Sequence, residues 1–207
     1  MRIGLDFDNT IVCYDEAIKI LVEKLFELPS ELQRTKLEVR DFLRAAGREQ
    51  EWIAFQGELY GPGMKYAEPF EDAIATMLQL QGDGHELVIV SHRSCRPYAG
   101  HPHDLHLAAR AWVADHLQRA GLFGNVGDKN YVHFLETRDQ KVSKVAELGC
   151  RVFIDDLPEV LTAPGFPPDT HPILFAPLRE GALAKQDNNA VIYSWCKLPQ
   201  LISALAL

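Results

Sequence analysis

Short apolar runs that end in polar residues recur along the chain and predict buried β-strands. Runs of this length are typical of strands that are buried on both faces of a sheet. The predicted strands are residues 2–7, 86–90, 131–135, 151–154 and 173–176. We therefore expect a sheet whose two faces are both covered.

Between these strands, apolar residues recur every three or four positions, which is the period of an amphipathic helix. One helix is predicted to begin at Glu68-Pro69. Asp104 is the predicted N-cap of a second helix, and Thr137 with Gln140 forms a capping-box pattern before a third. Strands that alternate with helices predict an α/β fold built on a parallel sheet.

One long stretch breaks this alternation, because it contains three helical patterns and no strand-like run. The three patterns cover residues 15–28, 30–46 and 49–59. Ser30 and Gln33 form a capping-box pattern at the start of the second, and the turn Gly61-Pro62-Gly63 follows the third.

We interpret residues 15–66 as a small helical cap inserted after the first strand, with a core domain made of residues 1–14 and 67–207. The alternative is that the extra helices pack on the core and never move. Several large or basic side chains of the insert either roof a pocket or pack the insert itself. They are Trp52, Phe55, Tyr60 and Lys65.

The composition is that of an ordinary globular protein, and its charge restricts the partners. The chain has 207 residues, of which 47% are hydrophobic and 24% are charged, so disordered and fibrous classes are excluded. The net charge of −8, without any basic run, repels phosphate backbones and anionic lipid. We expect neither a nucleic acid polymer nor a membrane as partner, whereas a small anionic substrate bound through a metal ion remains compatible.

The sequence also predicts a cytoplasmic location. The N-terminus reaches Asp6 after few apolar residues and does not resemble a signal peptide, and no apolar run approaches the roughly 20 residues that span a bilayer. The four cysteines lack paired spacing and are expected to be reduced thiols. They are Cys13, Cys95, Cys150 and Cys196.

Two carboxylates end the first strand, in the sequence Asp6-Phe7-Asp8-Asn9-Thr10. Alternation along the strand places Asp6 and Asp8 on the same side, where their repulsion requires a cation. Two such carboxylates beside Mg²⁺ suit a reaction in which one attacks phosphorus and the other transfers protons. The alternative is a turn in which Asp8, Asn9 and Thr10 only cap the next helix.

Further polar residues follow the second strand and begin a later helix. Ser91, with His92 and Arg93 after it, offers a hydroxyl and backbone N–H groups to a phosphoryl oxygen, although a Ser at this place is often an N-cap. Lys141 lies near a helix N-terminus, where a cation is unfavourable without a nearby anion. Lys144, one turn later, is the competing choice, and a solvated surface lysine is the alternative for both.

Acidic residues also end the fourth strand, where Asp155 and Asp156 are followed by Glu159. Burying these acids without a cation is costly, and hard oxygen ligands favour Mg²⁺ over zinc. A helix N-terminus decorated with acids is the alternative, but it accounts more readily for one carboxylate than for three.

The loop at residues 92–106 holds four of the eight histidines. Arg93 and Arg96 are candidates to bind a second anionic or hydroxylated part of a substrate. A zinc site is a second interpretation of this loop, and a polar loop without a fixed role is the third. The zinc ligands in that interpretation are His101, His103, Asp104 and His106.

Taken together, Asp6-Phe7-Asp8-Asn9-Thr10, Ser91, Lys141 and Asp155-Asp156 resemble the four motifs of the haloacid dehalogenase-like (HAD) hydrolases. The resemblance covers almost the whole chain outside the insert. It implies a Rossmann-like parallel sheet of five strands flanked by helices, with a small α-helical cap between the first and second motifs. The strand order that it implies is 173–176, 151–154, 2–7, 86–90, 131–135.

The resemblance also implies roles for the matching residues. Asp6 is the implied nucleophile and Asp8 the implied acid and base, while Ser91 and Lys141 hold phosphoryl oxygens. Mg²⁺ is implied at Asp6, the Asp8 backbone carbonyl and Asp155, with Asp156 or Glu159 acting directly or through water. Contacts with the substrate are expected from Asn9, Thr10, His92 and Arg93.

The second acid indicates the type of reaction. Dehalogenases of the family attack carbon and lack an acid equivalent to Asp8, so this chain resembles a phosphatase or phosphotransferase. We expect a Mg²⁺-dependent phosphomonoesterase that acts on a small phosphorylated metabolite, such as a sugar phosphate or a nucleotide. The alternative is a non-catalytic phosphate-binding or regulatory protein with the same fold.

Overall fold

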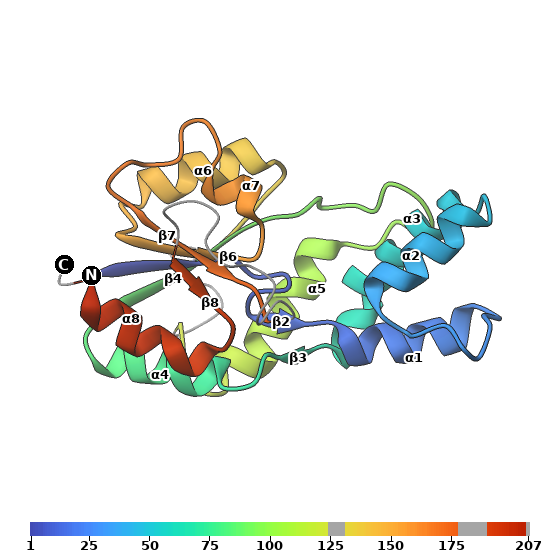
Figure 1. Cartoon of the computed structure of the whole chain (residues 1–207), viewed down its shortest axis with the longest axis horizontal. Helices are drawn as coiled ribbons and strands as arrows, with labels where there is room; N and C mark the ends of the chain where they lie inside the picture. Colours follow the sequence, from blue (N-terminus) through green and yellow to red (C-terminus); the bar gives the residue numbers. More distant parts are fainter. Residues whose placement is uncertain (124–130, 178–189, 206–207) are drawn as a thin grey trace.

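The computed structural model describes residues 1–123, 131–177 and 190–205. A parallel sheet forms its centre (Figure 1). Its strands are β1 (Arg2–Leu5), β4 (Glu86–His92), β5 (Val132–Leu135), β6 (Val152–Asp155), β7 (His171–Phe175) and β8 (Ala190–Ile192). Their spatial order is β5-β4-β1-β6-β7-β8, and every neighbouring pair is parallel. The predicted α/β fold is confirmed.

The five predicted strands lie in the expected order, but the prediction of five strands was wrong by one. A sixth strand, β8, pairs with β7 through Leu174 and Val191. The sequence around Val191 and Ile192 is apolar, but the run is short. It forms a strand only because it pairs with β7 at the edge of the sheet.

Helices cover both faces of the sheet (Figure 1). Helices α6 (Arg138–Glu147) and α7 (Pro158–Leu161) lie on one face, and α4 (Ala73–Gly82) and α8 (Leu198–Ala204) lie on the other. Within β4, Leu87 and Ile89 join one hydrophobic cluster, while Val88 and Val90 join the second. This alternation is why the strand reads as a continuous apolar run. The remaining core helices are α5 (Leu105–Trp112), η2 (Val113–Gln118) and η3 (Trp195–Lys197).

Two predicted N-caps are confirmed. The Asp104 carboxylate accepts the N–H of Leu107 at 2.8 Å and begins α5. Thr137 and Gln140 exchange the two hydrogen bonds of a capping box at the start of α6.

Two predicted helix starts were wrong. Glu68-Pro69 is a short strand, β3, which pairs with β2 (Val12–Cys13), so that α4 begins only at Ala73. The second helix of the insert begins at Lys36 with Thr35 as its N-cap, so the Ser30 pattern caps no helix.

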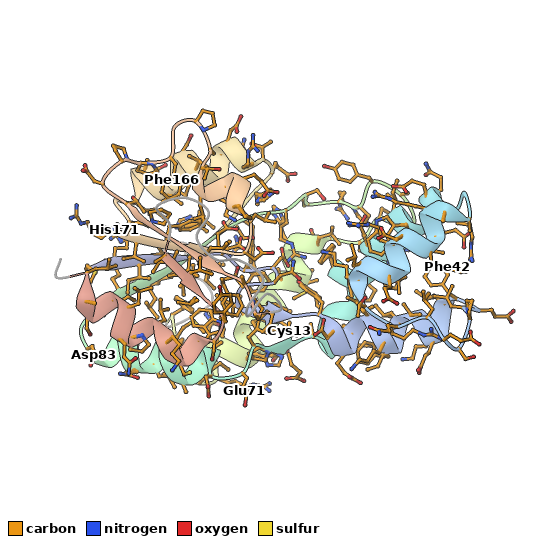
Figure 2. All side chains as sticks on the ribbon, in the orientation of Figure 1. Cys13, Phe42, Glu71, Asp83, Phe166 and His171 are labelled. Atoms are coloured by element: carbon orange, nitrogen blue, oxygen red, sulfur yellow. The ribbon has the colours of Figure 1, made fainter. Side chains whose placement is uncertain are left out.

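The insert consists of α1 (Asp15–Leu25), α2 (Lys36–Ala45), α3 (Glu49–Tyr60) and the 3₁₀ helix η1 (Pro62–Tyr66). These helices lie together beside the sheet (Figure 1), joined to it through the antiparallel pair β2 and β3. Figure 2 shows Cys13 at this junction and Phe42 out in the insert. Within residues 1–123, 131–177 and 190–205, no helix is long and apolar enough to cross a bilayer.

Candidate active site

The carboxyl ends of β1 and β6 bring two buried acids onto one lysine. Asp6 follows β1, and its backbone N–H donates to the Ile154 carbonyl at 2.9 Å. Lys141, in the first turns of α6, places its Nζ 2.5 Å from Asp6 Oδ1 and 2.6 Å from Asp155 Oδ2. Lys141 and Asp155 are fully buried, and Asp6 is 3% exposed. These three residues come from distant parts of the chain and meet because parallel strands end at one edge.

At this edge of the sheet, three carboxylates lie close together, and Lys141 supplies a single positive charge to them. Carboxylate oxygens of Asp6, Asp155 and Asp156 lie within 4.8 Å of one another. Burial, followed by repulsion from Asp6, raises the pKa values of Asp155 and Asp156 above their ordinary range. Asp155 Oδ2 makes no hydrogen bond with the described residues, although Lys141 lies at ion-pair distance.

A divalent cation fits this donor set. Three clustered carboxylates offer the hard oxygen ligands that Mg²⁺ prefers, and a cation at that place removes their repulsion. Glu159 does not belong to the cluster: it is exposed on α7, so the expectation that it assists the metal is not supported by its position.

The choice between Lys141 and Lys144 is decided by the two environments. The pKa of Lys141 is raised, because the attraction of Asp6 and Asp155 outweighs the effect of burial. Lys144 instead pairs with Glu147 at 2.6 Å near the surface. Lys141 is therefore the lysine that belongs to the acid cluster.

The turn after β1 positions the rest of the first motif. Asn9 adopts a left-handed backbone with φ of 59°, which an Asn tolerates better than most residues. This turn brings the buried Thr10 hydroxyl back to Asp6, to which it donates at 3.2 Å. Ser91 is 1% exposed at the end of β4, next to β1 in the sheet. These places agree with the predicted roles, which remain predictions.

The Asp8 carboxylate contacts two residues outside the acid cluster, Tyr14 and Arg93. Its Oδ1 accepts hydrogen bonds from the Tyr14 hydroxyl and from Arg93 at 3.2 Å. Both of these hydrogen bonds fall on Oδ1, and the role of Asp8 in proton transfer stays a prediction. The Asp8 carboxylate is not one of the three whose oxygens lie within 4.8 Å of one another, and it contacts Tyr14 and Arg93. The contact between the metal and the Asp8 backbone carbonyl stays a prediction.

Tyr14 contacts Asp8 in the structure, a contact that the sequence did not predict. Burial and the neighbouring Asp8 raise the pKa of Tyr14 well above its ordinary value, so the phenol stays protonated and donates. The only indication of this contact in the sequence was that Tyr14 follows Asp8 by six residues. A Tyr at the start of an insert more often packs in the hydrophobic core.

Arg93 is buried between the core and the insert. Its Nη2 donates to the Tyr60 carbonyl at 3.0 Å, and its guanidinium lies 5.8 Å from the ring centroids of Phe7 and Phe134. Its Nε has no hydrogen-bond partner among the described residues. Arg93 therefore orients Asp8 and ties α3 to the site, while substrate contact remains a prediction for it.

His92 lies on the side of the site that α6 and α7 form. Burial, together with the charge of Lys141, lowers its pKa, so the ring is neutral near pH 7. It lines a hollow of about 380 Å³ with residues from α6 and α7, including Thr137, Arg138 and Glu159. Its Nδ1 is buried without a hydrogen-bond partner among the described residues.

The four residues of the zinc interpretation do not form one group of potential ligands in the described part of the chain. His103 Nε2 lies 2.8 Å from Glu58 of the insert, Asp104 caps α5, and His106 Nε2 bonds the Arg93 carbonyl at 2.9 Å. A different group, Cys95, His106 and Glu136, has ligand atoms within 4.8 Å of one another. The loop therefore fastens the insert and α5 to the end of β4.

Comparison with known proteins rests on structure alone. No family model matches the sequence, and a search of curated proteins found no significant match. A haloacid dehalogenase-like family hydrolase from Xanthomonas campestris has 10% identity and a TM-score of 0.55, covering 99% of this chain and 95% of its own.

Two further solved structures cover nearly the whole chain. A HAD-hydrolase from Bacillus subtilis, bound to magnesium, has 14% identity and a TM-score of 0.58, over 97% of both chains. The L-2-haloacid dehalogenase from Xanthobacter autotrophicus, with covalently bound chloropropionic acid, has 14% identity and a TM-score of 0.53, over 99% of this chain and 98% of its own. From end to end, this chain therefore has the fold of the haloacid dehalogenase-like hydrolases.

Proposed function

We propose that this protein is a Mg²⁺-dependent HAD-superfamily phosphomonoesterase acting on a small phosphorylated metabolite. The observation that carries the proposal is the pairing of buried Asp6 with Lys141 and two further acids, with a second carboxylate, Asp8, held nearby by Tyr14 and Arg93. In this proposal, Asp6 is the carboxylate that attacks and Asp8 the one that transfers protons.

The chain's own residues account for both halves of the reaction. Asp6 attacks phosphorus in line, the bond from phosphorus to the leaving oxygen breaks, and Asp8 gives that oxygen a proton. Asp8 then removes a proton from the water that attacks the aspartyl phosphate, which releases phosphate and restores Asp6. Lys141, with the Ser91 hydroxyl, stabilises charge on the phosphoryl oxygens.

Asp6, Asp155 and Asp156 are the residues that would hold Mg²⁺, together with the Asp8 carbonyl expected from the motif. When bound, the ion would offset the negative charge of the acids and of the transferring phosphoryl group.

The second acid separates this proposal from dehalogenation. A structural neighbour is a dehalogenase with a covalently bound organic acid, so the fold alone is compatible with attack on carbon. The contacts of Asp8 with Tyr14 and Arg93 hold a carboxylate that a reaction without a proton donor does not need. This arrangement supports phosphate ester hydrolysis.

Phosphate release from a panel of sugar phosphates and nucleotides, with Mg²⁺ or with EDTA, tests the proposal. We expect turnover only with Mg²⁺, and Asp8→Asn should lower kcat by about 10²–10⁴-fold because proton transfer is lost. Asp115→Asn, a surface acid paired with Arg119, is the control. Halide release from 2-haloacids that persists in Asp8→Asn, without any phosphate release, would assign the protein to the dehalogenases.

Mg²⁺ should stabilise the protein more at about pH 8 than at about pH 5. The raised pKa values of Asp155 and Asp156 mean that the metal-free fold binds protons that the unfolded chain has released. Their contribution to stability therefore falls as the pH rises above about 4. Mg²⁺ replaces those protons, so the increase in Tm on adding Mg²⁺, measured by calorimetry, should grow with pH. An equal increase at both pH values would show that these acids do not bind the ion.

A further inference from the structure

A lysine of the insert, Lys36, is connected through two tyrosines to Asp8, the proposed proton donor. Lys36 begins α2, and its ammonium donates to the Tyr60 hydroxyl at 2.7 Å. Tyr60 ends α3, and its ring meets the ring of Tyr14 edge-on with centroids 5.1 Å apart. Tyr14 in turn donates to Asp8. A continuous series of contacts therefore runs from Asp8 to the ammonium of Lys36.

The charge of Lys36 has no direct counterion among the described residues, since no carboxylate lies within 4.0 Å of its Nζ in that part of the chain. Burial opposes its charge, but the Tyr60 hydroxyl and the more distant carboxylates of Asp8 and Asp156 outweigh that effect and raise its pKa. The ammonium thus stays charged, and two acids of the site, Asp8 and Asp156, are among the groups that stabilise its charge.

The position of Lys36 on its helix is also unfavourable without an anion. It is the first residue of α2, where the helix dipole disfavours a positive charge. Lys141 has the same disadvantage in α6, and there two carboxylates compensate for it. Other lysines of the insert are exposed: Lys19 pairs with Glu16, and Lys24 donates to the Tyr66 hydroxyl at 2.9 Å. Lys36, like Lys24, contacts a tyrosine hydroxyl rather than a carboxylate, but it is half-buried, and its tyrosine partner packs against Tyr14 beside Asp8.

We propose that Lys36 and Tyr60 form a subsite for a second anionic group of the substrate. The substrates are then small phosphate monoesters that carry a carboxylate or a second phosphate at the end away from Asp6. This inference rests on the proposed function and adds the substrate class to it. Arg93 is not part of the subsite, because its Nη1 and Nη2 already donate to Asp8 and to the Tyr60 carbonyl.

Binding of stable phosphonates, measured by titration calorimetry with Mg²⁺ present, tests the subsite without turnover. Phosphonoacetate and 3-phosphonopropionate are each compared with their uncharged primary amides, and propane bisphosphonate is compared with propylphosphonate. In the wild type, at least one doubly anionic ligand should bind about tenfold more tightly than its partner. Lys36→Gln should abolish that preference, Lys36→Arg should retain most of it, and Lys24→Gln should leave it unchanged.

The two classes of ligand distinguish a carboxylate from a second phosphate as the bound group. The subsite is wrong if the wild type shows no preference, or if Lys36→Gln weakens charged and uncharged ligands equally, as general damage to the insert would. A preference that depends on Lys36, in a protein that releases phosphate from no monoester, would support the subsite and contradict the catalytic proposal alone.

Discussion

Replacing Asp6 by Asn is expected to reduce kcat for phosphate release by at least about 10⁴-fold. The amide keeps the size of the side chain but lacks the nucleophilic carboxylate oxygen. The fold should survive, because the substitution removes one of three acids gathered around Lys141. We therefore expect the Tm of the metal-free Asp6→Asn variant to be no lower than that of the wild type, as measured by calorimetry beside the activity assay.

Asp83→Asn is a suitable control for the loss of one negative charge. Asp83 is exposed beyond the end of α4, away from the site (Figure 2). This variant should keep its activity within about twofold, as surface substitutions generally do. Substantial hydrolysis by Asp6→Asn would rule out Asp6 as the nucleophile.

Replacing Lys141 by Met is expected to affect stability and activity together. Met has a similar length but no charge, so Asp6 and Asp155 would face each other in a buried site without their shared cation. Breaking a buried ion pair in this way costs about 3–5 kcal/mol. We expect that loss of unfolding free energy for the metal-free variant in urea denaturation at about pH 8, and a smaller loss at about pH 5, where Asp155, whose pKa is raised, takes up a proton.

The same Lys141→Met variant should lower kcat by at least about 10²-fold even when Mg²⁺ restores part of its stability. Lys144→Met is the matched control, because Lys144 lies one turn along the same helix and pairs only with Glu147 at the surface. Surface pairs contribute little, so this control should change stability by no more than about 1 kcal/mol. Equal effects of the two substitutions would remove Lys141 from the site.

The central part of the site was predictable from the sequence because of the geometry of parallel sheets. Asp6 and Asp155 each end an apolar strand, and Lys141 lies near the start of a helix, where a cation requires a nearby anion. Since the carboxyl ends of parallel strands share one edge, these residues had to lie near one another once the strand order was known. Period-two alternation and the capping box are local signals that survive in the folded protein.

Two of the elements that were predicted wrongly lack such local signals. The strand β8 is three residues long and exists through its pairing with β7, while Glu68-Pro69 is taken from the expected helix by pairing with β2. For β8 and for Glu68-Pro69, a contact distant in sequence outweighs the local pattern. The start of α2 is different, because Thr35 caps it through the nearby Glu38 N–H, a local signal that the Ser30 pattern was preferred to.

The sequence by itself determined the α/β alternation and the acids at the strand ends, because each follows from local periodicity and charge, whereas the choice of Lys141 over Lys144 needed the structure. Only the tertiary structure decided that Asp8 turns towards Tyr14 and Arg93, and that Lys36 reaches the same side of the insert. Side-chain direction across a junction depends on how the insert docks on the core, and no local pattern along the chain encodes that docking.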